Sequence, residues 1–219
     1  MIPVYCISLE SLGRREKMAA ELQRVGFTDI TFVQATEPMQ GFSMNNMRRN
    51  ARGEFGCALS HVKAIMQAFF DDQYSALFVE DDIEFVEGGV ERFCRATDNS
   101  YTDLLYLGGH PRAPVVEMKC EGIVEGIVKA GLWSCAEAYY MRRYTMRDFL
   151  QFWVDRAGQP NAMFDFILGE FAAIQEEAYA MYPPATHQPP GWSHIGQKHD
   201  DKRELIRRGW ENNLSTKSL

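Results

Sequence analysis

Residues 77–85, LFVEDDIEF, constrain the fold more than any other stretch of this chain. Apolar residues lead into three consecutive carboxylates, Glu80, Asp81 and Asp82, and apolar residues resume directly afterwards. A short run of this kind is typical of a buried β-strand whose C-terminal end brings acids to one edge of a sheet. Since open α/β sheets bind their ligands at the carboxyl ends of strands, the run also predicts where a functional site lies.

The three adjacent carboxylates favour a bound cation. They repel one another, and a divalent ion neutralises such a group well. Because the candidate ligands are hard oxygens with no cysteine beside them, magnesium or manganese suits them better than zinc. The alternative is a solvated acidic turn, and the position at a strand end favours the metal site.

Length and charge narrow the class of protein. A chain of 219 residues fits one generous domain with a sizeable core. The net charge of −7 argues against a general nucleic-acid-binding protein, which needs basic surface for phosphate contacts. Five scattered cysteines without a C-x-x-C pair predict reduced thiols in a cytoplasmic protein. No run approaches the roughly 20 apolar residues of a membrane-spanning helix.

The order of the predicted elements indicates an α/β fold. Strands over residues 2–9 and 30–33 enclose a helix over 14–25, and this alternation predicts a parallel sheet with covering helices. Residues 36–53 form a long predicted loop, which is functional, mobile or merely solvated. The other predicted helices cover residues 54–70, 88–96, 144–154 and 161–176, and the other predicted strands cover 74–79, 103–109, 123–128, 136–141 and 178–182.

The composition changes after Gly196. Residues 198–219 hold six Lys or Arg against four Asp or Glu, with Trp210 among them. This pattern predicts a polar, basic tail over residues 197–219, either frayed or acting as a weak amphipathic anchor at the inner membrane.

Three motifs in the first part of the chain together suggest a family. They are residues 7–9 followed by Arg14 and Arg15, residues 53–61 with the sequence GEFGCALSH, and residues 77–83. Their order and spacing resemble glycosyltransferase family 25, which includes bacterial lipooligosaccharide galactosyltransferases and collagen galactosyltransferases. Residues 138–141, Asp165 and residues 183–195 resemble later parts of the family pattern.

The resemblance implies a fold and a reaction. The expected fold is a single GT-A-type α/β domain over residues 1–196, with a central mixed, mainly parallel sheet flanked by helices. Residues 1–110 would form the nucleotide-sugar half and residues 111–196 the acceptor half. The implied activity is an inverting, metal-dependent transfer of a hexose, galactose from UDP-galactose, to a hydroxyl of a glycan or glycolipid acceptor such as lipooligosaccharide.

The resemblance also implies roles for the acids. Asp82 would bind Mn²⁺ or Mg²⁺, Glu80 would contact the ribose, and Asp81 would orient the loop or reach the sugar, unless it is a solvated acid. His187 would complete the metal's coordination, with Gln188 and His194 as rival ligands.

Four further residues are implied at the donor site: Leu9, Arg14, Ser60 and His61. Arg14 follows the first strand and could reach the base, ribose or phosphate, although a surface arginine is the plain alternative. His61 lies with Ser60 on a helix face expected to point at the sheet, where a histidine often only completes the core.

Asp165 is the candidate catalytic base. It lies between Phe164 and Phe166, and apolar surroundings raise the pKa of a carboxyl, which suits a general base. The alternative is a helix N-cap. Two other functions stay open from the residues alone: a metal-dependent phosphohydrolase or nucleotidyltransferase, and a non-catalytic nucleotide-sugar-binding module.

Overall fold

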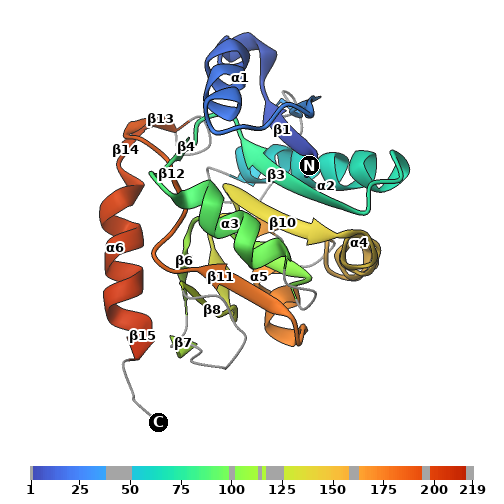
Figure 1. Cartoon of the computed structure of the whole chain (residues 1–219). Coiled ribbons are helices and arrows are strands. Elements are labelled where there is room, and N and C mark those ends of the chain that lie inside the picture. Colours follow the sequence, from blue (N-terminus) through green and yellow to red (C-terminus); the bar gives the residue numbers. More distant parts are fainter. Residues whose placement is uncertain are drawn as a thin grey trace.

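The computed structural model describes residues 2–37, 51–98, 102–112, 115–116, 126–157, 163–193 and 198–215. Within these ranges, a central sheet of seven strands crosses the molecule with helices on both faces (Figure 1). The strand order is β2 (Ile30–Gln34), β1 (Val4–Ser8), β3 (Ser75–Glu80), β10 (Ala138–Arg142), β5 (Leu104–Tyr106), β11 (Ala178–Met181) and β8 (Ile127–Lys129).

The sheet is mixed. Strands β2, β1 and β3 run parallel, β10 is antiparallel to both of its neighbours, β5 and β11 run parallel, and β8 is antiparallel to β11. Helices α1 (Arg15–Arg24) and α3 (Gly89–Asp98) contribute to the hydrophobic cluster on one face. Helices α2 (Ala51–Phe70), α4 (Arg143–Arg156) and α5 (Phe164–Ile174) contribute to the cluster on the other. The predicted α/β architecture is therefore confirmed.

The period-2 geometry of the strands explains this two-sided core. In β3, Phe78 belongs to the cluster under α2, while its neighbours Leu77 and Val79 belong to the cluster under α1 and α3. Successive side chains of a strand point to opposite faces, so a strand that is covered on both sides reads as a continuous apolar run. The run ends at Glu80, where the strand leaves the covered part of the sheet.

Short elements complete the edge of the sheet where β3 ends. Strand β4 (Glu84–Phe85) pairs with β12 (Thr186–His187), which brings the chain after β11 back to the acidic loop. The remaining elements are η1 (Glu10–Leu12), β6 (His110–Pro111), β7 (Val115–Val116), β9 (Trp133–Ser134), β13 (Gly191–Ser193), β14 (Lys198–Asp200), α6 (Lys202–Asn213) and β15 (Leu214–Ser215).

Helix α6 corrects the prediction of a polar tail. It runs along the side of the domain (Figure 1), and Trp210 is only 5% exposed. Its ring lies 5.3 Å from that of Trp133 and 4.6 Å from that of Tyr182, and its Nε1 donates a hydrogen bond to the Gly109 carbonyl. Ile206, one turn earlier, is buried as well. Because the same face carries both apolar residues, Trp210 belongs to the core and does not contact a membrane.

Several predicted features lie partly outside the described residues. They include positions 38–50 of the long loop, residues 123–125 of the strand expected at 123–128, Cys120, and His194. No helix in the described ranges is both long enough and apolar enough to cross a membrane.

Candidate active site

The acids after β3 are held by the last residue of β1 and by Arg14, which follows β1. The Ser8 hydroxyl donates to Asp81 Oδ2 at 2.7 Å, and Arg14 Nη1 lies 3.2 Å from both Asp81 Oδ1 and Asp82 Oδ2. The two strands are parallel neighbours, with Ile7 opposite Glu80, so their carboxyl ends meet at one edge of the sheet. Asp81 is nearly buried in these contacts, which disagrees with a freely solvated acid, and Arg14 is directed at the acids.

A second group of contacts ties the acids to the C-terminal part of the chain. Gln188 follows β12, and its amide nitrogen donates to Glu80 Oε2 at 2.6 Å and to Asp82 Oδ1 at 2.7 Å. The Gln188 amide oxygen accepts a hydrogen bond from the Lys202 ammonium at the start of α6. Two carboxylate acceptors on its nitrogen side and an ammonium donor on its oxygen side determine the orientation of this amide.

His61 contacts Glu80 from the buried side of the site. Its Nε2 lies 3.3 Å from Glu80 Oε1, its Nδ1 lies 3.0 Å from the Tyr139 hydroxyl, and its ring stacks on Phe164 at 4.2 Å. The side chain is buried, so His61 positions the acid from within the core. Ser60 instead links α2 to the chain after β2, because its hydroxyl donates to Gly56 and accepts from the Thr36 amide.

The surroundings of Glu80 and Asp82 shift the pKa values of these two carboxyls in opposite directions. Burial alone would raise the pKa of Glu80, but its hydrogen bond to His61 and the charge of Lys202 outweigh burial and lower the pKa. Burial and the negative charge of Glu80 raise the pKa of Asp82, and Arg14 only partly offsets them. Glu80 is therefore a stable anion, whereas Asp82 lacks sufficient positive charge around it.

Asp165 lies in the first turn of α5, close to this group. Its Oδ2 accepts a hydrogen bond from the Cys135 amide at 3.4 Å, and burial raises the pKa of its carboxyl. Met163 occupies the N-cap position of α5, so Asp165 is not the cap residue. A part-buried carboxyl with a raised pKa can accept a proton from a substrate hydroxyl.

A comparison with known families decides what these residues belong to. The family model described as "Glycosyltransferase family 25 (LPS biosynthesis protein)" matches residues 1–112, about half of the chain. The chain belongs to glycosyltransferase family 25. The sequence motifs predict the same family.

A named viral protein also matches part of this family 25 chain. A protein of Acanthamoeba polyphaga mimivirus named "Procollagen lysyl hydroxylase and glycosyltransferase" is 35% identical over 104 residues, covering 42% of this chain and 11% of the relative. The matched segment thus spans about a tenth of the length of that protein.

Solved structures show the fold. S. aureus TarS 1-349, solved in complex with UDP-GlcNAc, matches with a TM-score of 0.52 at 12% identity, over 97% of this chain and 67% of that one. A glycosyltransferase involved in glycosylation of the major capsid of PBCV-1 matches with a TM-score of 0.45 at 11% identity, over 76% and 72%. The TarS match confirms the GT-A-type fold.

The candidate metal ligands are not all brought together in the family 25 enzyme. His187 Nε2 lies 3.8 Å from Glu84 Oε2, and it is Gln188, its predicted rival, that contacts Asp82. Within the described ranges, the group of potential ligands close enough to share an ion is Cys57, His61 and Glu80. Neither Asp82 nor His187 belongs to it.

The ligand atoms show which of two places suits a metal ion better: the group of Cys57, His61 and Glu80, or Asp82. Burial raises the pKa of the Cys57 thiol well above its ordinary value, and a protonated thiol does not suit a hard divalent ion. Asp82 is different, because 38% of its side chain is exposed and its carboxylate lacks balancing charge. Asp82 therefore suits a magnesium or manganese ion that enters from solvent. Cys57 and His61 instead hold Glu80 in place through hydrogen bonds.

Glu137 is a buried acid at this site that sequence reasoning missed. It precedes β10, its main-chain carbonyl accepts from the Glu80 amide at 2.9 Å, and both its carboxylate oxygens lack a hydrogen-bond partner among the described residues. Burial raises its pKa to about 8. A Cβ at Gly108 would lie 2.2 Å from Glu137 Oε1, so only glycine leaves room for this side chain. An acid inside the apolar run 136–141 was the available sequence signal.

Glu137→Gln is expected to stabilise the protein at about pH 8 and to leave its stability near pH 5 unchanged. Because the Glu137 pKa rises from 4.5 to about 8 on folding, the native state holds a proton that the unfolded chain releases within that window. Stability therefore falls as pH rises through it, by up to a few kcal/mol at about 1.4 kcal/mol per pKa unit. Thermal unfolding at both pH values measures the effect.

The matched control for this measurement is Glu211→Gln, on the exposed side of α6. An equal change in melting temperature at both pH values for Glu137→Gln would show that the carboxyl of Glu137 titrates normally in the folded protein.

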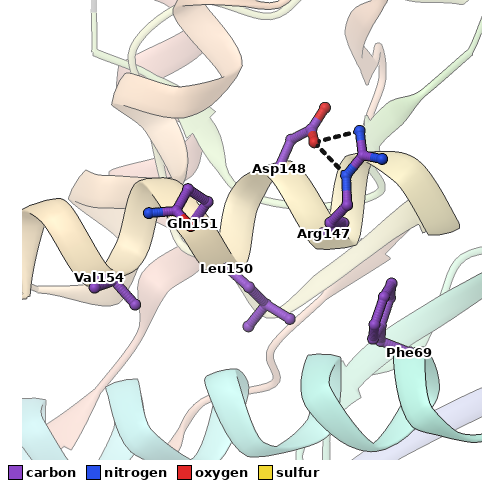
Figure 2. A pocket seen from close by; sticks show the side chains of 6 residues that line it. All are labelled: Phe69, Arg147, Asp148, Leu150, Gln151 and Val154. Atoms are coloured by element: carbon purple, nitrogen blue, oxygen red, sulfur yellow. Dashed lines mark hydrogen bonds and ion pairs between the residues drawn. The ribbon is translucent and has the colours of Figure 1, made fainter.

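A groove between α2 and α4 lies apart from the acids. It is lined by Phe69, Arg147, Asp148, Leu150, Gln151 and Val154 (Figure 2), none of which the sequence analysis placed at the site. Figure 1 shows α4 at the right of the molecule and α6 at the left.

Proposed function

We propose that this family 25 enzyme transfers galactose from UDP-galactose to a hydroxyl of a glycan acceptor such as lipooligosaccharide, with inversion at the anomeric carbon. The observation that carries the proposal is the convergence of Arg14, Glu80, Asp82 and Gln188 where β1 and β3 end. This is the edge of an α/β sheet at which nucleotides bind. UDP as the nucleotide draws on the relative of similar fold that was solved with UDP-GlcNAc.

Donor binding requires charge relief on the diphosphate. Asp82 would hold Mg²⁺ or Mn²⁺, and such an ion, when bound, stabilises negative charge on the departing diphosphate. Arg14, which already contacts Asp81 and Asp82, would add a fixed positive charge beside it. Glu80 Oε1 is contacted by Cys57 and His61, whereas Oε2 accepts from Gln188 and keeps a lone pair that could receive a ribose hydroxyl.

Asp165 would act on the acceptor side. It comes from the first turn of α5, next to Phe164, whose ring stacks on His61. Its raised pKa suits removal of a proton from the acceptor hydroxyl as that oxygen attacks the anomeric carbon. Inversion follows from a single displacement opposite the diphosphate.

We place the enzyme in the cytoplasm. The described cysteines Cys6, Cys57, Cys94 and Cys135 are all free thiols, which supports a reducing compartment. An association with the inner membrane would have to use a surface other than Trp210, because that side chain is buried.

Asp82→Ala is expected to weaken UDP binding in the presence of Mn²⁺ by about tenfold or more, because a charge-assisted contact typically contributes ~1.5–3 kcal/mol. Isothermal calorimetry with UDP, with and without a chelator, measures the loss. Asp148→Ala on α4, an exposed acid paired with Arg147, is the matched control. Wild-type affinity in Asp82→Ala, or UDP binding that a chelator does not affect, would rule out the metal role of Asp82.

The transfer itself is tested with a panel of nucleotide sugars and lipooligosaccharide acceptors that lack terminal residues. UDP-galactose should give a glycosylated acceptor with the opposite anomeric configuration to the donor. Phosphate release without a glycosylated product would instead indicate a phosphohydrolase, and binding without turnover would indicate a non-catalytic module.

A further inference from the structure

Lys202, the first residue of α6, reaches the acidic loop. The sequence counted it only as one charge of a basic tail, yet its ammonium donates a hydrogen bond to the Gln188 amide oxygen. The same amide donates to Glu80 and Asp82 through its nitrogen. Lys202 is therefore one hydrogen-bonded residue away from both acids, and a rigid amide connects them.

Helix α6 holds this lysine firmly in place. Trp210 packs in the core against Trp133 and Tyr182, and Asn213 Nδ2 donates to the Pro111 carbonyl at 3.1 Å. Lys202 lies in the first helical turn, where the positive end of the helix dipole disfavours a cation. The nearby carboxylates must therefore provide the stabilisation that keeps the ammonium there.

The charges around Lys202 agree with this. Burial would lower the pKa of Lys202, but the carboxylate of Glu80 and the charges of Glu137 and Asp82 raise it above the ordinary value. The lysine is thus a permanent cation.

The balance of charges around the acidic loop affects the binding of a negatively charged donor. Among the described residues of this hydrogen-bonded group, the acidic loop contributes three carboxylates, and Arg14 and Lys202 contribute two positive charges. Without Lys202 the loop would present a larger excess of negative charge to an incoming diphosphate. Like charges at this range repel strongly where water is partly excluded.

We propose that Lys202 is the resident cation of the donor site and that its ammonium contacts the diphosphate of the nucleotide sugar, beside the ion that Asp82 would hold. The inference rests on the proposed function and adds a donor-binding residue to it. Before the donor arrives, the ammonium balances Glu80 and Asp82 through Gln188. With the donor bound, it gains phosphate oxygens as partners and supports the departing diphosphate as its charge grows.

The test measures two affinities in Lys202→Met. Loss of the ammonium should weaken UDP binding in the presence of Mn²⁺ by about 10- to 100-fold, the usual effect of losing a charge-assisted hydrogen bond. Loss of a nearby positive charge should also strengthen binding of Mn²⁺ alone by several-fold, because the ion no longer meets electrostatic repulsion. Calorimetry gives the first affinity, and electron paramagnetic resonance of free Mn²⁺ gives the second.

The controls separate charge from folding. Lys202→Arg keeps the positive charge and should bind UDP within a few-fold of wild type. Arg207→Met removes one positive charge from the exposed side of the same helix and should change neither affinity. A structural defect would weaken both ligands together, whereas the proposal requires the two affinities of Lys202→Met to move in opposite directions.

The remaining outcomes are equally distinct. If both affinities fall in Lys202→Met, or neither changes, the proposal is overturned. If Mn²⁺ binds more tightly but UDP affinity stays at the wild-type value, Lys202 balances the acids without touching the diphosphate, and the proposal also fails. Wild-type protein that binds GDP but not UDP would overturn the proposed donor, while the comparison of Lys202 variants would proceed with GDP.

Discussion

Asp165→Asn is expected to lower turnover by about 10²–10⁴-fold while UDP affinity with metal stays near the wild-type value. The amide keeps the shape of the carboxyl but cannot take a proton from the acceptor hydroxyl. The Cys135 amide, which donates to Asp165 Oδ2, would find an amide oxygen in its place, so the start of α5 should stay folded. Steady-state kinetics with donor and acceptor, together with UDP calorimetry, measures the split between catalysis and binding.

Asp155→Asn is the control for this variant, because Asp155 is an exposed acid on α4. Asp165→Asn activity within a few-fold of wild type would assign the base to another group, and Glu137 would be the next residue to test. A loss of UDP binding or of cooperative unfolding would instead identify Asp165 as a structural residue.

Trp210→Ala is expected to cost about 3–5 kcal/mol of unfolding free energy, the usual loss for removing a large buried aromatic side chain. The substitution removes ring contacts with Trp133 and Tyr182 and the hydrogen bond from Nε1 to the Gly109 carbonyl. Urea denaturation measures the difference. Deleting residues 197–219 should be at least as damaging, because it removes all of α6.

Val154→Ala provides the comparison for Trp210→Ala, since Val154 is an apolar residue that is 70% exposed on α4. It should change the unfolding free energy by less than about 0.5 kcal/mol. If Trp210→Ala or the deletion kept wild-type stability and full-length protein bound anionic liposomes through Trp210, the membrane-anchor interpretation of the tail would be restored.

Local sequence pattern determined the acidic end of β3 and its place in the sheet. An apolar run that is covered on both faces and ends in carboxylates has few other solutions, and the run 77–85 behaves as this rule predicts. Arg14 could be placed at the same edge for a similar reason. It follows β1 by a short turn, and consecutive parallel strands end on the same side of a sheet.

The choice between His187 and Gln188 needed the tertiary structure. Both stand in the same short segment, and the resemblance implied His187 as the metal ligand with Gln188 as a rival. In the structure β12 pairs with β4 so that His187 lies opposite Glu84, and the next side chain, Gln188, turns to Glu80 and Asp82. In extended chain a shift of one residue exchanges the two sides, and only the pairing register decides which residue faces the site.

Glu137 and Lys202 also needed the tertiary structure, because both are far in sequence from the acids that they approach. The sequence contains the 3.6-residue period that brings Ile206 and Trp210 to one side of α6, but the basic residues between them suggested a solvated tail. What the sequence by itself determined was therefore the seven strands of the central sheet, helices α1 to α5 and the acids at the end of β3. Which distant charges meet those acids depended on packing, because burying Trp210 places Lys202 at a position that no local pattern specifies.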